Sequence, residues 1–151
     1  MELLKKAEEI VNKSTIHTVG ESGLDADWIM SLIDEEGYPN ASMITASRAD
    51  GFKWISFCTG IDYNKPKRVQ KNPRACIYLF DRASFSGISL TGKINISTDL
   101  KIKKKMWYDA LGDYFNNPDD EKLCVLFFRP EKYNIFVDYR TITGNFNINA
   151  N

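Results

Sequence analysis

The side chains of Thr59 and Lys65 are placed to bind an anion. Thr59 ends an apolar, strand-like run, and Lys65 follows after a short loop, where Asn64–Lys71 can begin a helix. The hydroxyl can donate a hydrogen bond, the ammonium group supplies charge, and free N–H groups at a helix N-terminus favour a negative group. The pattern predicts a phosphate-binding corner between a strand and a helix. The alternative is a plain strand-end hydroxyl beside a solvated lysine.

Length and composition restrict the classes of protein to consider. The chain has 151 residues, of which 43% are hydrophobic, so we expect one packed domain over residues 1–151. Lys+Arg and Asp+Glu both number 20, and this balance argues against a dedicated nucleic-acid binder. We find no signal peptide and no apolar run of membrane-spanning length, which predicts a cytoplasmic protein without a membrane partner.

Cysteine and histidine usage gives no catalytic or metal motif. The cysteines are far apart in apolar runs, and we expect them to be reduced core residues: Cys58, Cys76 and Cys124. The lone histidine, His17, cannot complete a metal cluster or a Ser-His-Asp arrangement. Tyr63, Cys58 and Tyr139 are only weak candidates for proton transfer, so we name no catalytic residue.

Hydrophobic periodicity predicts mostly strands, with helices between them. Strands are expected over Asp27–Glu35, Ala41–Ser47, Lys53–Cys58, Arg74–Phe80, Ser86–Ser97, Leu123–Phe128 and Tyr133–Val137. Helices are expected over the first dozen residues, over Asn64–Lys71, and from a cap at Thr98 or Asp99 to about Phe115. Without alternating β-α-β units, a mainly β fold built as an antiparallel barrel with a few peripheral helices fits best.

Three local features refine this outline. Gly92 predicts a bulge or barrel-corner kink within its strand. The lysine run from Lys101 to Lys105 predicts a solvated helix face. The tail from about Arg140 is rich in Asn, Thr and Gly, and we expect it to be partly disordered.

The order of motifs from Tyr38 to Gly92 resembles the pyridoxamine 5′-phosphate oxidase-like flavin-binding split barrels, particularly their short general-stress-protein branch. The motifs are Gly37-x-Pro39, Ser42-Met43-Ile44, Gly51-Phe52, Phe57-Cys58-Thr59, Lys65, Asn72-Pro73-Arg74-Ala75, Gly92 and, later, Phe128-Arg129-Pro130. The resemblance covers about two-thirds of the chain, and it implies an antiparallel Greek-key split β-barrel.

The resemblance also implies a homodimer with FMN at the subunit interface. The strand of Ser42, Met43, Ile44, Thr45 and Ser47 would run beside the isoalloxazine ring and contact it through backbone groups. Cys58, Thr59 and Lys65 would approach the phosphate, and the region near Ser86–Ile88 would approach the ring.

The chain departs from the family pattern around the phosphate. Ser42 stands where the pattern usually has a phosphate-binding arginine, Ser47 stands where the oxidase has lysine, and Tyr63-Asn64 replaces a Ser-Arg pair. Lost cations weaken phosphate binding, since charge-assisted hydrogen bonds are about twice as strong as neutral ones. Candidates to replace them are Lys67, Arg68 and Arg48.

The leading hypothesis is an FMN-binding protein that acts as a flavin-dependent oxidoreductase on a small molecule. Oxidation of vitamin B6 is not expected, because the substrate-binding arginine and histidine near the oxidase C-terminus have no convincing match. One alternative is a non-catalytic module that binds FMN or another ligand, such as haem, a deazaflavin or a free nucleotide. A dimeric scaffold without any ligand is the third possibility.

Overall fold

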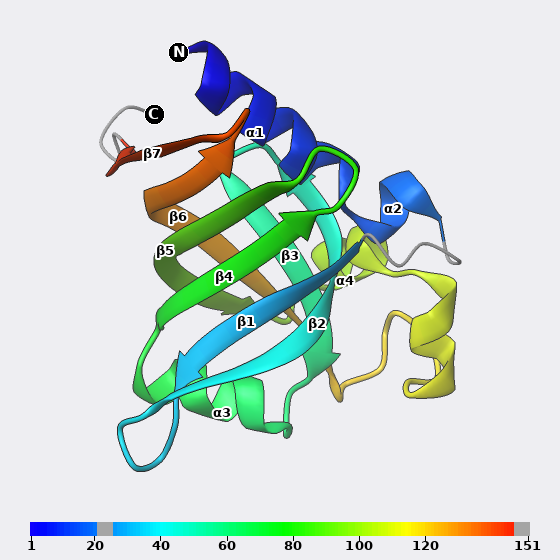
Figure 1. Cartoon of the computed structure of the whole chain (residues 1–151). Coiled ribbons are helices and arrows are strands. Elements are labelled where there is room, and N and C mark those ends of the chain that lie inside the picture. Colours follow the sequence, from blue (N-terminus) through cyan, green and yellow to red (C-terminus); the bar gives the residue numbers. More distant parts are fainter. Residues whose placement is uncertain (21–25, 147–151) are drawn as a thin grey trace.

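The computed structural model describes residues 1–20 and 26–146, and strands are its main elements (Figure 1). The strands are β1 (Asp27–Ile33), β2 (Pro39–Asp50), β3 (Trp54–Gly60), β4 (Arg74–Asp81), β5 (Ser86–Ser97), β6 (Leu123–Val137) and β7 (Arg140–Asn145). The helices are α1 (Glu2–Lys13), α2 (Ile16–Val19), α3 (Asn64–Lys71), α4 (Leu100–Met106) and the 3₁₀ helix η2 (Asp109–Asp113). None of the helices within these described ranges is long and apolar enough to cross a membrane.

The strands form a closed antiparallel barrel. Their order is β3-β2-β1-β4-β5-β6-β7, and β3 also pairs with β6, so the first six strands in that order complete a ring. Strand β7 adds to the free edge of β6. The prediction of a mainly β, antiparallel barrel with peripheral helices is confirmed.

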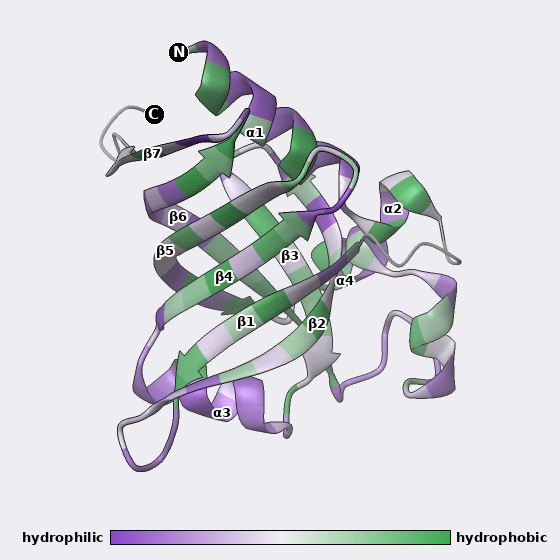
Figure 2. Ribbon diagram, in the orientation of Figure 1, coloured by the Kyte–Doolittle hydropathy of each residue, from purple (hydrophilic) through white to green (hydrophobic). Residues whose placement is uncertain are grey.

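Alternation along the strands fills the barrel interior. In β1, Trp28, Met30 and Leu32 point inward and are at most 2% exposed. Helix α1 packs its apolar stripe, which includes Ala7 and Val11, against the same core, while its polar face stays outside (Figure 2). The expected amphipathic N-terminal helix is therefore confirmed.

A second apolar cluster covers the outside of the barrel where β3 meets β6. It joins side chains of both strands to α4 and the 3₁₀ segment: Cys58, Met106, Leu111, Phe115, Leu123 and Val125. Strand β3 is consequently buried on both faces, with Ile55 and Phe57 in the interior.

Helix α4 ends at Met106, so the prediction of one helix as far as Phe115 is wrong. Side chains from distant segments bind the carbonyl of Met106: Ser47 Oγ donates to it at 2.5 Å, and His17 Nε2 lies 3.3 Å away. Arg48 Nε donates to the preceding carbonyl, that of Lys105, at 2.9 Å. These contacts satisfy carbonyls at the end of the helix, where no further helical N–H follows.

Strand β6 runs unbroken through Arg129-Pro130, where the sequence predicted two strands. The register shifts at this point, between Thr91 and Gly92 on β5. A Cβ atom at Gly92 would lie 2.1 Å from the carbonyl oxygen of Arg129, so only glycine allows the two backbones to approach. The irregularity predicted at Gly92, a bulge or a barrel-corner kink, is therefore present, but the extra residue is Glu131 on β6, next to the proline.

The C-terminal segment is more ordered than predicted. Residues Arg140–Asn145 form β7 and pair with Lys132–Val137, although we expected a partly disordered tail from about Arg140. The lysine run on α4 also differs at one position. Lys103 is only 3% exposed, and its Nζ donates to the carbonyl of Asp120 at 2.6 Å.

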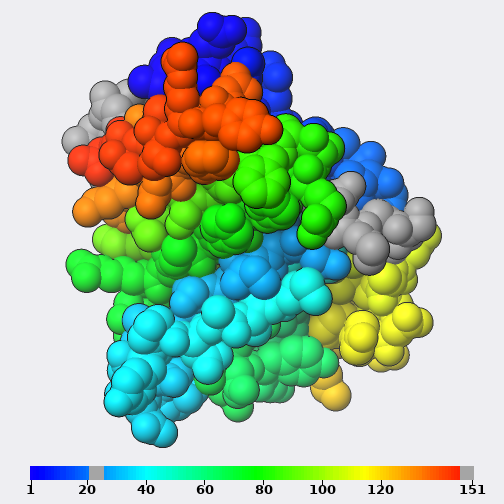
Figure 3. All heavy atoms as spheres, in the orientation of Figure 1, coloured from blue at the N-terminus to red at the C-terminus, as the bar shows by residue number. Residues whose placement is uncertain are grey.

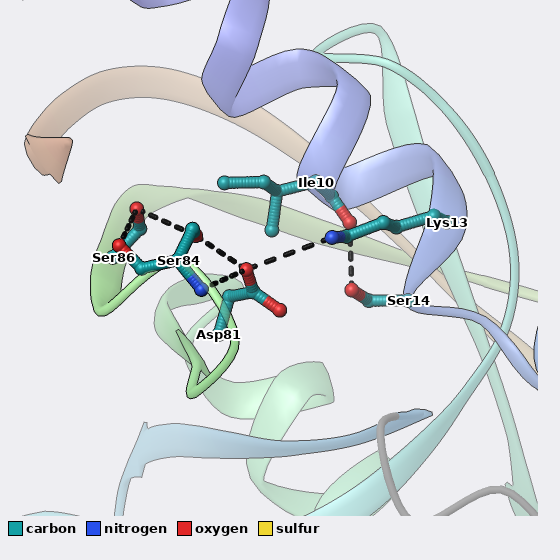
Figure 4. Close-up of polar contacts among 6 residues, drawn as sticks. All are labelled: Ile10, Lys13, Ser14, Asp81, Ser84 and Ser86. Carbon is teal, nitrogen blue, oxygen red and sulfur yellow. Dashed lines mark hydrogen bonds and ion pairs between the residues drawn. The ribbon is translucent and has the colours of Figure 1, made fainter. Parts of the chain in front are cut away.

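Hydrogen bonds and an ion pair connect the β4–β5 turn to the end of α1 (Figure 4). The carboxylate of Asp81 accepts hydrogen bonds from the backbone and side chain of Ser84, and it lies 3.6 Å from Lys13 Nζ. Burial by itself would raise the pKa of Asp81, but the Ser84 hydroxyl and the Lys13 ammonium outweigh it, and the pKa is lowered.

Candidate functional site

The predicted strand–helix corner is a hollow in the molecular surface. Thr59, Tyr63, Asn64 and Lys65 line a space of about 400 Å³ between the end of β3 and the start of α3. The structure thus brings together the hydroxyl and the ammonium group on which the anion prediction depends. Tyr63 and Asn64 complete the lining.

Local contacts fix the shape of this corner. Tyr63 N donates to Gly60 O at 3.0 Å, and Ile61 N donates to Lys122 O at 2.7 Å. The Tyr63 ring covers Gly60 so closely that a Cβ there would lie 2.7 Å from its Cε1 atom. The Tyr63 ring also lies near the Phe115 ring, with 6.4 Å between the two ring centroids. The aromatic wall of the hollow is therefore held by packing.

The donor set at the corner suits a phosphate group. Helix α3 begins at Asn64, so the backbone amides of Asn64 and Lys65 have no carbonyl partner within the helix. Pro66, next along the first turn, has no N–H to contribute. Together with the Thr59 hydroxyl and the Lys65 ammonium group, these amides supply the neutral and charged donors that an anion requires.

Lys65 is the cation nearest to this donor set. Its side chain is half-buried, and burial, followed by repulsion from the Arg68 guanidinium, lowers its pKa from the ordinary value. Among the described residues no carboxylate forms an ion pair with it. An anion in the hollow would favour the charged form that the protein alone disfavours.

The barrel is split next to the corner, along the first half of β2. Residues 39–45 pair with β1, whereas pairing between β2 and β3 begins only at Ala46. Ser42 lies opposite Met30 and shares its inward-facing side, yet Ser42 is exposed while Met30 is fully buried. Figure 3 shows atoms of this half-strand, in cyan, at the surface beside those of α3.

The predicted cofactor residues fall into two groups. Ser42 and Met43 are exposed, Ile44 is half-buried, and the Thr45 hydroxyl donates to Asp27 Oδ1 at 2.7 Å. All four lie on the half-strand whose outer edge has no β partner among the described residues. Contact of these residues, and of Thr59 and Lys65, with a cofactor stays a prediction.

Ser47 and Cys58 lie deeper than that open edge. Ser47 is fully buried and donates to Met106 O, and Cys58 Sγ lies 3.6 Å from the same carbonyl. Burial raises the pKa of the Cys58 thiol to about 12. In this structure both side chains therefore hold α4 in place and leave the phosphate corner to Thr59 and Lys65.

Two of the three candidate replacement cations are engaged elsewhere. Arg68 binds Glu35 through Nε at 3.1 Å and Nη2 at 3.4 Å, and its Nη1 donates to Asn40 at 3.1 Å. Arg48 donates to a carbonyl at the end of α4. Lys67 is exposed, and within the described residues it has no ion pair. The Arg68 contacts tie the β1–β2 hairpin to α3.

Sequence reasoning missed the roles of Tyr63, Asn64 and the Glu35–Arg68 pair. Tyr63 was noted as a weak candidate for proton transfer and, with Asn64, as a departure from a family pattern. The place of both residues directly before Lys65 could have identified them as lining residues. Glu35 and Arg68 are far apart in sequence, and no periodic signal relates them.

The chain is similar to known proteins both in sequence and in structure. The family profile described as Pyridoxamine 5′-phosphate oxidase matches residues 28–136. The chain is similar to General stress protein 26 of Bacillus subtilis (strain 168), with 28% identity over 100 residues, which are 64% of this chain and 70% of the relative. Among solved structures, a Clostridium acetobutylicum protein related to general stress protein 26 has 27% identity and a TM-score of 0.75, with 95% of this chain and 94% of that chain covered.

Two more distant structures share the fold. One is a Nostoc punctiforme protein described as pyridoxamine 5′-phosphate oxidase-related and FMN binding, with 11% identity, a TM-score of 0.68 and 95% of each chain covered. The other is a heme-binding protein from Mycobacterium smegmatis, with 16% identity, a TM-score of 0.71, and coverage of 94% of this chain and 57% of that one. The match of the family profile over residues 28–136, together with the shared split-barrel fold, shows that the chain belongs to the pyridoxamine 5′-phosphate oxidase family.

Proposed function

We propose that the protein binds FMN along the split of its barrel and serves as a flavin-dependent oxidoreductase for a small molecule. The observation that carries the proposal is the half-buried Lys65, which has no carboxylate partner among the described residues and lines a hollow with the Thr59 hydroxyl and the start of α3. The phosphate of FMN would lie there. The FMN-binding relative from Nostoc punctiforme supports the choice of ligand.

The free edge of β2 supports the placement of the flavin ring. Backbone N–H and C=O groups of residues 42–45 that face away from β1 have no strand partner among the described residues. Such groups need hydrogen-bond partners, and the polar edge of an isoalloxazine ring provides both donors and acceptors. The ring would continue from the phosphate corner along this edge, beside Ser42 and Thr45.

An exposed apolar row on the outer barrel face supports a homodimer. Met43, Ile29 and Tyr78 lie side by side across β2, β1 and β4, and they are 63%, 40% and 41% exposed. Contiguous apolar surface of this kind commonly marks a protein interface. A second subunit on this face would also cover the flavin, which the single barrel leaves open along the split.

In this function the cofactor supplies the redox chemistry, and the protein supplies binding and orientation. Thr59 and Lys65 hold the phosphate, and the β2 edge orients the ring. At the closed end of the split β2 is buried on both faces, because Ala46 packs in the barrel core and Ser47 binds the Met106 carbonyl, and this burial excludes water from that end of the site. We do not propose pyridoxamine 5′-phosphate oxidation, for which the chain lacks matching substrate residues.

Titration of the purified protein with FMN, followed by quenching of flavin fluorescence, tests the proposal. We expect a dissociation constant in the micromolar range or below. A dissociation constant in the millimolar range would overturn the proposal, and tighter binding of haem in a parallel titration would replace FMN as the ligand. Sedimentation of the FMN-loaded protein tests the dimer, for which we expect twice the mass of the 17.3 kDa chain.

A further inference from the structure

Positive side chains gather on the outer face of β4, β5 and β6, away from the flavin corner. Arg74 pairs in register with Lys93, and Lys93 pairs with Arg129. Residues directly opposite each other in an antiparallel pair share a face, so these three exposed side chains form one row. Arg74 is the first residue of β4, and Figure 1 shows the start of this strand above α3.

The row brings like charges close together. Ile94 N donates to Pro73 O at 2.9 Å, so the neighbouring Arg74–Lys93 pair is of the non-hydrogen-bonded kind. In such pairs the Cα atoms are only about 4.5 Å apart and the side chains approach closely. None of the ion pairs formed by the described residues includes Arg74, Lys93 or Arg129. Like charges in direct opposition destabilise a sheet, so this row of cations is unfavourable for the fold.

A groove of about 460 Å³ adjoins the row. It is lined by Ser31, Ile33, Pro39, Arg74, Ala75, Cys76, Thr91, Gly92, Lys93, Glu131 and Lys132. Three of these side chains are cationic and one, Glu131, is acidic, while Ser31, Thr91 and Cys76 add small polar groups. The volume lies within the range of about 300–1,000 Å³ that is typical of small-molecule sites.

We infer that this groove binds a small organic anion that carries a chain of linked phosphate groups. Arg74 can bind phosphate oxygens in a bidentate manner, while Lys93 and Lys132 contribute point charges on either side of Thr91. The negative charge of the bound phosphates offsets the repulsion between the opposed cations. The site is distinct from the flavin corner, because none of the residues that line the groove lines the corner formed by Thr59, Tyr63, Asn64 and Lys65.

Nucleic acid fits this groove less well than a small polyphosphate. None of the residues that line it is aromatic, although binding of single strands relies on aromatic stacking. The formal net charge of the chain is also +0, without the basic excess that long-range attraction to nucleic acid requires.

Calorimetric titration with tripolyphosphate at low salt tests the inference. We expect saturable binding that weakens at least tenfold in the double variant Arg74→Gln/Lys93→Gln. The control variant Lys101→Gln/Lys105→Gln removes the same charge from exposed positions on α4 and should bind within twofold of the wild type. The Arg74→Gln/Lys93→Gln variant should also melt no lower than the wild type, because the substitutions remove repulsion.

Backbone amide shifts locate the site independently. We expect tripolyphosphate to shift the amide signals of Thr91, Lys93 and Lys132, and a Lys65→Gln variant to retain the binding. The inference does not depend on the flavin site, so loss of FMN affinity leaves it intact. Absence of binding, equal weakening in the control variant, or tighter binding of a single-stranded oligonucleotide would each overturn it.

Discussion

Replacement of Lys65 by glutamine should weaken FMN binding without affecting riboflavin binding. The substitution keeps most of the side-chain volume and removes the charge that lines the corner with Thr59. A hydrogen bond to a charged group contributes about 1.5–3 kcal/mol. Because the Lys65 side chain is half-buried rather than fully enclosed, we expect the lower end of that range, and about 1.5 kcal/mol corresponds to roughly tenfold in the dissociation constant.

Flavin fluorescence titrations of the wild type and the variant, each with FMN and with riboflavin, measure this effect. Riboflavin lacks the phosphate, so its affinity should be equal in the two proteins. Lys71→Gln is the matched control, since Lys71 is an exposed cation on the same helix that does not line the hollow. The reasoning is refuted if both ligands weaken equally, or if FMN affinity is unchanged. As pH rises, Lys65 loses its charge and FMN affinity should fall. Because the pKa of Lys65 is lowered, this fall should begin at a lower pH than at a site with an ordinary lysine.

Three further outcomes test the fold. Gly92→Ala places a Cβ 2.1 Å from the Arg129 carbonyl oxygen and should lower the unfolding free energy by at least about 2 kcal/mol in chemical denaturation, whereas Gly112→Ala, with open space around its Cβ, should stay within about 1 kcal/mol of the wild type. The pKa of Asp81 is lowered, so its contribution is present above the unfolded-state value and disappears as pH falls through the folded-state value; unfolding free energy should fall more steeply below about pH 4 in the wild type than in Asp81→Asn. Burial raises the pKa of two of the three thiols to about 12, so a colorimetric thiol reagent should modify Cys76 alone in the native protein; rapid reaction of all three thiols would contradict this.

Elements with a strong local pattern were predictable from the sequence. Alternation of Trp28, Met30 and Leu32 identified β1, and the helical spacing of apolar residues identified α1. The Thr59–Lys65 corner was also predictable, because both of its parts lie within one short stretch and depend on a strand end and a helix start. An irregularity at Gly92, a bulge or a barrel-corner kink, was predictable because glycine within a strand commonly marks such a site.

The errors have a common physical cause, which is contact between segments far apart in the chain. Nothing near Met106 ends α4; the side chains of Ser47, Arg48 and His17 bind the carbonyls there. Pro130 reads locally as a strand breaker, but β6 accommodates it with a bulge at the next residue, Glu131, and continues. The lysine run appeared solvated, yet Lys103 reaches a carbonyl of the loop that follows η2.

The closure of the ring by β3 and β6 has a consequence for how the polypeptide reaches its native state. On a ribosome, β1 to β5 emerge before β6, which must pair with both β3 and β5. Until then the edges of β3 and β5 remain unpaired, and such edges can recruit other nascent chains. We expect acquisition of the native state to be slow for a chain of this size, since the decisive contacts are distant in sequence, and chaperone demand during synthesis should end when β6 is released from the exit tunnel.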